Sequence, residues 1–112
     1  MRIIITQNDA KKAFEFAVEY AHNPNEMSLR PGWGCRCLLA AVFHNRFGGE
    51  IGVGTDYANG EGLSIRLGRR GRRIRESYDE QSNWGKDTPK EEIAGVVDSF
   101  VGDYFAIKVR KV

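Results

Sequence analysis

The chain has 112 residues and a formal net charge of +2, and 41% of its residues are hydrophobic. This length and composition are typical of one globular domain and exclude two separately folded ones. No apolar run approaches the roughly 20 residues needed to cross a bilayer, and the apolar stretch after Met1 is too short for a signal peptide. We therefore expect a single cytoplasmic domain over residues 1–112 with no membrane association.

The N-terminal residues predict a strand followed by a helix. Arg2–Thr6 is rich in β-branched side chains, which favour strands. From Ala10 onward, apolar residues recur at helical spacing, and Asn8 or Asp9 suits the cap of that helix. Because proline disfavours helical geometry in the residue before it, the helix is expected to end near His22.

A second helix is expected from about Cys35 to Phe47, after a loop rich in proline and glycine. The double glycine that follows, Gly48 and Gly49, predicts a left-handed helix end. Beyond it the pattern changes to short strands, and the first of these is expected over Glu50–Gly54.

The middle of the chain predicts a hairpin rich in arginine. Leu63–Leu67 is one expected strand, residues 68–71 form the turn, and Arg72–Glu76 returns as the next strand. The buried members of this hairpin are expected to be Ile65, Leu67 and Ile74.

The C-terminal part predicts a helix and a last strand. Thr88 and Pro89 are typical of a helix start, and the helix is expected to run to about Phe100. Residues 104–109 alternate apolar and basic side chains, as a half-buried strand does. The order of elements indicates an α+β domain, with helices packed on a small antiparallel sheet.

Cys37 is the candidate nucleophile, because a thiol at a helix start is stabilised as a thiolate by the helix dipole. Such a thiol needs a base, and His44 lies roughly 10.5 Å along the same helix, too far for a catalytic contact. His22 is the remaining candidate base. The alternative is that Cys37 is an apolar core residue, as most free cysteines are.

The two cysteines do not predict a disulfide or a metal site. Cys35 and Cys37 are only two residues apart, which strains a disulfide between them. Together with a histidine they do not match the spacing of common zinc sites. We therefore expect neither a metal nor another cofactor.

Several of these segments together resemble the YunG-like family of small bacterial proteins, which look like minimal papain- or transglutaminase-like domains. The resemblance covers about residues 34–81. The segments that carry it are Arg36–Ala41 with Cys37, Phe47–Ile51 with its double glycine, Arg66–Leu67, Gly71–Ile74 and Asp79–Gln81.

The resemblance implies a minimal papain-like arrangement of helices and sheet, with Cys37 in the place of the family cysteine. The family histidine position falls at Gly62 or Leu63, so the expected base is not retained. The resemblance therefore implies a shared fold and does not transfer the family's chemistry.

The arginine cluster is the other functional candidate. Guanidinium groups bind phosphates bidentately and stay charged at all relevant pH values. A hairpin that presents them would bind nucleic acid or an acidic protein surface, whereas pairing with neighbouring acids would make it an ordinary solvated turn. The candidate binding residues are Arg66, Arg69, Arg70, Arg72, Arg73 and Arg75.

The sequence thus leaves three hypotheses. The first is a non-catalytic binding or regulatory protein that engages a polyanion or an acidic protein through the arginine-rich hairpin. The second is a cysteine-dependent hydrolase or acyltransferase that uses Cys37 with His22 or an unusual base. The third is a purely structural or regulatory protein in which neither feature is active.

Overall fold

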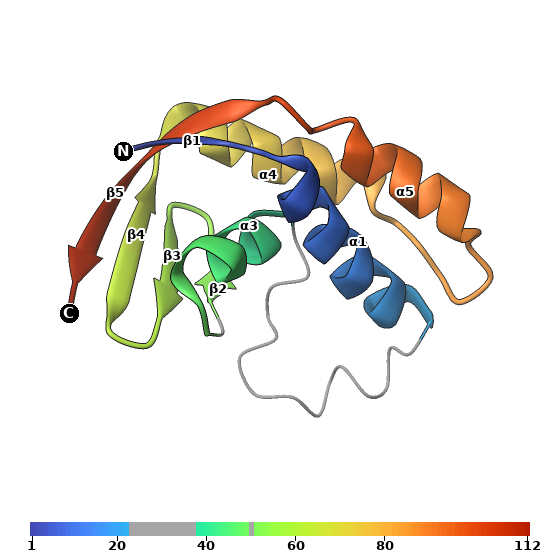
Figure 1. Ribbon diagram of the computed structural model, residues 1–112, viewed down its shortest axis with the longest axis horizontal. Helices are drawn as coiled ribbons and strands as arrows, with labels where there is room; N and C mark the ends of the chain where they lie inside the picture. The colour runs from blue at the N-terminus through green and yellow to red at the C-terminus, as the bar shows by residue number, and fades with distance from the viewer. Residues whose placement is uncertain (23–37, 50) are drawn as a thin grey trace.

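The computed structural model describes residues 1–22, 38–49 and 51–112. Within them, four helices pack on a five-stranded antiparallel sheet, so the expected α+β class is confirmed (Figure 1). The elements are β1 (Arg2–Ile4), α1 (Gln7–His22), α3 (Leu38–Phe47), β2 (Gly52–Val53), β3 (Tyr57–Gly60), β4 (Leu63–Leu67), α4 (Arg69–Gln81), α5 (Lys90–Asp98) and β5 (Tyr104–Lys111).

The strand order is β1-β5-β4-β3-β2, so the first and last strands of the chain pair with each other. In this register Ile3 lies opposite Phe105 and Leu67 lies opposite Ile107. Residues that lie opposite each other, and every second residue along a strand, are on the same face of a sheet. These positions therefore belong to a single inner face. Its buried side chains are Ile3, Ala58, Ile65, Leu67, Phe105 and Ile107.

The opposite face, which we call the outer sheet face, carries mainly exposed side chains. The same register assigns its members from four strands, and none of them is acidic. They are Arg2 and Ile4 of β1, Tyr104, Ala106, Lys108 and Arg110 of β5, Ser64 and Arg66 of β4, and Tyr57 and Asn59 of β3.

Helices α3 and α4 contact the inner face. The ring of Phe43 in α3 lies 6.0 Å from that of Phe105, in an edge-on arrangement. A Cβ on Gly71 in α4 would lie only 3.2 Å from the Phe105 side chain. Helix α1 packs on α3 and α5 through a stripe of buried alanines, and Figure 1 shows the strands gathered at the left with α1 and α5 at the right.

Helix α1 begins earlier than the sequence predicts, and its cap is Thr6 rather than Asn8 or Asp9. The Thr6 hydroxyl accepts a hydrogen bond from the Asp9 N–H at 3.2 Å, and the Asp9 carboxylate accepts one from the Thr6 N–H at 2.9 Å. This reciprocal pair is a capping box. It also ends β1 at Ile4, two residues before the expected end.

Asp9 is the one buried charged residue among the described positions, with 2% of its surface exposed. Besides Thr6, its carboxylate accepts hydrogen bonds from Asn45 at 3.1 Å and from Arg46 at 2.8 Å. Burial acts to raise the pKa of Asp9, but the hydrogen bonds from Thr6, Asn45 and Arg46 outweigh it and hold the pKa below its usual value. The cluster ties the start of α1 to the end of α3.

The double glycine ends α3 as expected. Gly48 and Gly49 have φ angles of 73° and 70°, in the left-handed region that disfavours a side chain. The Gly48 N–H donates to the carbonyl of His44 at 2.9 Å, which closes the last turn. The expected body of this helix is therefore confirmed from Leu38 onward, and its expected start at Cys35 lies outside the described residues.

The expected arginine-rich hairpin is wrong, because residues 69–81 form the helix α4. Its buried residues, Gly71, Ile74 and Tyr78, recur at helical spacing. Gly71 is a packing residue rather than a turn residue, since a side chain there would press against Phe105. Ile65, Leu67 and Ile74 are nevertheless buried as expected.

The remaining strands and α5 differ from expectation mainly at their ends. Strand β4 matches the expected bounds, whereas β3 was not anticipated, because Tyr57–Gly60 has little apolar alternation. Strand β5 runs two residues further than expected, and Val109, although on the inner face, is 37% exposed. Among the described helices, none is long and apolar enough to cross a membrane.

Candidate functional site

The arginines of helix α4 lie on two different sides of the helix. At about 3.6 residues per turn, Arg69, Arg70 and Arg73 share one side of the helix, whereas Arg72 and Arg75 lie on the other. Between the two sides runs the buried stripe that packs on the sheet. Arg66 is not on this helix and belongs to the outer sheet face.

Arg72 and Arg75 are engaged in ion pairs. Arg72 contacts the Asp56 carboxylate at 2.9 Å, and Arg75 contacts Asp79 at 3.4 Å and Glu76 at 3.9 Å. Partial burial raises the pKa of Asp79, and the attraction of Arg75 opposes this shift. These two arginines are therefore paired with acids, as the alternative to a binding role expects, although Arg75 is only 19% exposed.

Arg69, Arg70 and Arg73 line one side of a hollow of about 350 Å³. Its other lining residues come from α4 itself and from the turn before β5. They include one acid, Asp103, and among the described residues no ion pair joins Asp103 to these arginines. Three exposed guanidinium groups therefore face this hollow with one carboxylate to balance them. The remaining lining residues are Ile74, Ser77 and Phe100.

Tyr104 contacts two guanidinium groups, that of Arg70 and a fourth one, that of Arg2. The guanidinium carbons of Arg2 and Arg70 lie 3.9 and 4.0 Å from the centroid of the Tyr104 ring. Arg2 belongs to β1, on one side of β5. Arg70 is the second residue of α4, which follows β4 on the other side of β5, and Gly68 before it donates a hydrogen bond to Ala106 of β5. The ring therefore lies between the two cations, each in a cation–π contact.

A second hollow, of about 410 Å³, adjoins the first at Arg70. The described residues that line it include Arg2, Arg70 and Tyr104, and none of them is acidic. We call the two hollows together the arginine site. The residues that define it are Arg2, Arg69, Arg70, Arg73 and Tyr104, with Asp103 at its edge.

The start of α4 adds to the positive potential of the arginine site. Its first turn contains no acid, and no side chain caps the helix at Gly68. Helix N-termini carry partial positive charge and usually have acidic residues or caps, so arginines there are electrostatically unfavourable without an anion. The arrangement is chemically suited to phosphate groups, which guanidinium forks bind bidentately.

The catalytic hypothesis receives little support from the histidines. Cys35 and Cys37 lie outside the described residues. His22 is partly buried, and its Nε2 lies 3.1 Å from the Thr88 carbonyl, to which it can only donate. His44 hydrogen-bonds through Nδ1 to the Gly49 carbonyl at 2.6 Å, where it supports the end of α3.

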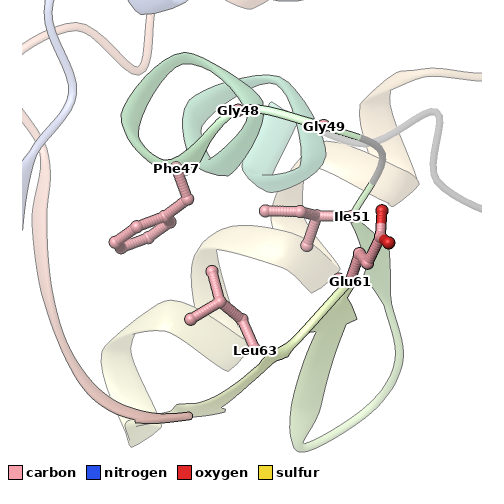
Figure 2. A pocket seen from close by; sticks show the side chains of 7 residues that line it. Phe47, Gly48, Gly49, Ile51, Glu61 and Leu63 are labelled. Carbon is pink, nitrogen blue, oxygen red and sulfur yellow. The ribbon is translucent and has the colours of Figure 1, made fainter. Parts of the chain in front are cut away.

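A third hollow, of about 570 Å³, lies beneath the double glycine. In Figure 2 the side chains of Phe47, Ile51 and Leu63 point toward a common space, and the Glu61 carboxylate lies to one side, beside Ile51. None of the described residues that line it carries an imidazole or a hydroxyl group. Nor does the described part of the chain contain a group of three or more His, Cys, Asp or Glu side chains placed to hold a metal.

Comparison with family models, with curated proteins and with solved structures gives no significant match. The interpretation of the arginine site therefore depends on its own geometry and charge.

The structure thus brings together three of the six arginines that the sequence singles out, and separates Arg66, Arg72 and Arg75 from them. It also adds Arg2 and Tyr104, which sequence reasoning missed. Their positions depend on the pairing of β1 with β5, which joins the two ends of the chain. The alternation of residues 104–109 was the available signal, since it predicts which side chains face outward.

Proposed function

We propose that this protein is a non-catalytic binding protein that engages a polyanion, namely nucleic acid, through the arginine site. The observation that carries the proposal is the stack of Arg2, Tyr104 and Arg70 beside Arg69 and Arg73. Four guanidinium groups gather around two adjoining hollows, and one carboxylate lies among them. Phosphate groups are the ligands that such a site fits best.

The geometry favours a nucleic acid over an acidic protein. A phosphodiester chain presents its charges at regular intervals, so several phosphates reach neighbouring guanidinium groups at once. Stacking on Tyr104 fixes two of these groups in advance, which lowers the side-chain entropy lost on binding. An acidic protein surface would have to place separate carboxylates, each on its own mobile side chain, at the same fixed positions.

A charge-reversal experiment tests the proposal. Arg69→Glu combined with Arg73→Glu replaces two exposed cations that make no ion pair among the described residues. An acid at position 69 suits the first turn of a helix, so α4 is expected to remain folded. Fluorescence anisotropy with a labelled oligonucleotide of about 12 nucleotides should show at least a tenfold loss of affinity at low salt.

The matched control is Lys86→Glu with Lys90→Glu, which changes the net charge equally at exposed positions before and at the start of α5. Figure 1 shows α5 at the opposite end of the molecule from the strands. We expect the control to lose at most a few-fold in affinity through its effect on net charge. Equal losses in the two variants would contradict a localised site, and unmeasurable binding by the wild type would contradict the function itself.

The papain-like scaffold and the cysteine-dependent alternative stay predictions. Cys37 lies outside the described residues, and the partner that His22 does make is the Thr88 carbonyl. No observation in the described part of the chain favours catalysis over binding, so we retain binding as the proposed function.

A further inference from the structure

The outer sheet face is a second basic surface, distinct from the arginine site but continuous with it. It carries four cations and no acid, and helices α3 and α4 pack on the other side of the sheet. The cations Arg2, Arg66, Lys108 and Arg110 are all exposed. Among the described residues, Arg66, Lys108 and Arg110 make no ion pair.

The register places these cations beside an exposed aromatic ring. Tyr57 on β3 lies opposite Arg66 on β4, and Arg66 lies opposite Lys108 on β5. The three residues thus form a row across the sheet, with Tyr57 at its end and 48% exposed. Side chains opposed in this way are close neighbours on one face.

A second row runs beside the first. Asn59, Ser64 and Arg110 occupy successive strands in the same register and add hydrogen-bonding groups to the surface. Tyr57 and Tyr104 are separated by four residues along the strands and by two strand spacings across them. These steps are about 13 Å and about 9.6 Å, which gives a span of about 16 Å between the two tyrosines.

Arg2 and Tyr104 belong both to this face and to the arginine site. A chain of phosphates held at the arginine site can therefore continue over the sheet without leaving positively charged surface. The path passes from α4 across Tyr104 to Lys108 and Arg66 and ends at Tyr57.

We propose that the outer sheet face binds single-stranded nucleic acid, with a base stacked on Tyr57 and the phosphates on Arg66, Lys108 and Arg110. This inference rests on the proposed function and names the class of nucleic acid. An exposed ring with flanking cations suits unpaired bases, because every base has a π-face and single strands expose it. A duplex keeps its bases stacked inside, so it would use the cations but not Tyr57.

The test compares two single strands of equal length and charge, one with bases and one abasic. Both are about 12 nucleotides long, and affinities are measured by anisotropy for the wild type and for Tyr57→Ala. The affinity of the wild type for the strand with bases should be roughly fivefold or more higher than for the abasic strand. A difference of this size is the contribution of one stacked base. Tyr57→Ala should abolish this preference, and Tyr57→Phe, which keeps the ring, should retain it.

A second variant separates this inference from the proposed function. Arg69→Glu with Arg73→Glu should weaken both strands alike and leave their ratio unchanged. Equal wild-type affinity for the two strands, or a preference that survives in Tyr57→Ala, would overturn the sheet-face inference and leave the arginine site intact. Absence of binding to any oligonucleotide, or tighter binding of poly-glutamate than of the oligonucleotide, would overturn both.

Discussion

Asp9→Asn should destabilise the fold strongly, although it changes only one side chain and keeps its size. The Asp9 carboxylate is 2% exposed and accepts four hydrogen bonds, two from Thr6, one from Asn45 and one from Arg46, at 2.8 to 3.1 Å. Hydrogen bonds to a charged group contribute about 1.5–3 kcal/mol, against about 0.5–1.5 kcal/mol for neutral pairs. Neutralising the acceptor therefore removes about 1 kcal/mol from each of two or three bonds.

We expect the free energy of unfolding to fall by about 2–3 kcal/mol. The loss is no larger because the Asn45 side-chain amide can turn over and keep its hydrogen bond to position 9. For a domain of this size that corresponds to a fall of roughly 10 °C or more in Tm. The assay is urea unfolding followed by circular dichroism. Glu15→Gln is the matched control, because Glu15 pairs with Lys12 at 3.4 Å while 52% exposed, and it should cost about 0.5 kcal/mol or less.

The pH dependence gives the sharper test. The pKa of Asp9 is lowered in the folded protein, so its charge stabilises the fold fully above the unfolded pKa, about 3.9. That stabilisation is lost as the pH falls through the lower, folded value. The difference in the free energy of unfolding between wild type and Asp9→Asn should therefore be greatest near neutral pH and decrease in acid. An equal difference at neutral and strongly acidic pH, or a cost no larger than that of Glu15→Gln, would refute this reasoning.

Three other variants and probes test separate parts of the structure. Gly71→Leu should lose about 1–3 kcal/mol in urea unfolding, because a Cβ there lies 3.2 Å from Phe105, whereas Gly95→Ala, with open space around it, should gain up to about 1 kcal/mol. If Gly95→Ala lost stability and Gly71→Leu gained it, the result would argue against the packing of α4 on the sheet. Tyr104→Ala should cost two- to fivefold in oligonucleotide affinity by releasing two guanidinium groups, each held by about 0.5–1 kcal/mol, and unchanged anisotropy titrations would speak against the stack. Cys37 should react slowly with a thiol probe near neutral pH, while fast, stoichiometric labelling there would favour the hydrolase alternative.

The sequence was most informative where a pattern depends on neighbouring residues. The strand over Leu63–Leu67 and the left-handed end of α3 at Gly48 follow from local alternation and from glycine's freedom at positive φ. The cap of α1 also had a local signal, since Thr6 and Asp9 have capping-box spacing. Strand propensity, which continues through Thr6, concealed it.

The sequence was misleading where a residue's role depends on distant contacts. Gly71 is typical of a turn when only its neighbours are considered, but it lies within α4, where a Cβ would be only 3.2 Å from the Phe105 side chain. The helical spacing of Ile74 and Tyr78 was present in the sequence and would have corrected the hairpin. The alternation of residues 104–109 indicates only that Tyr104 faces outward, and its contacts with Arg2 and Arg70 depend on the sheet order, which brings three separate elements together.

The salt dependence of single-strand binding tests the central claim most directly. Each phosphate contact on a single strand contributes about −0.7 to the slope of log affinity against log salt. With four to seven contacts from the arginine site and the outer sheet face, we predict a wild-type slope of about −3 to −5. Arg69→Glu with Arg73→Glu removes two contacts and should make the slope shallower by about 1.4, while Lys86→Glu with Lys90→Glu should leave it unchanged. A wild-type slope near zero, or the same slope in the arginine variant as in the wild type, would contradict nucleic-acid binding through this site.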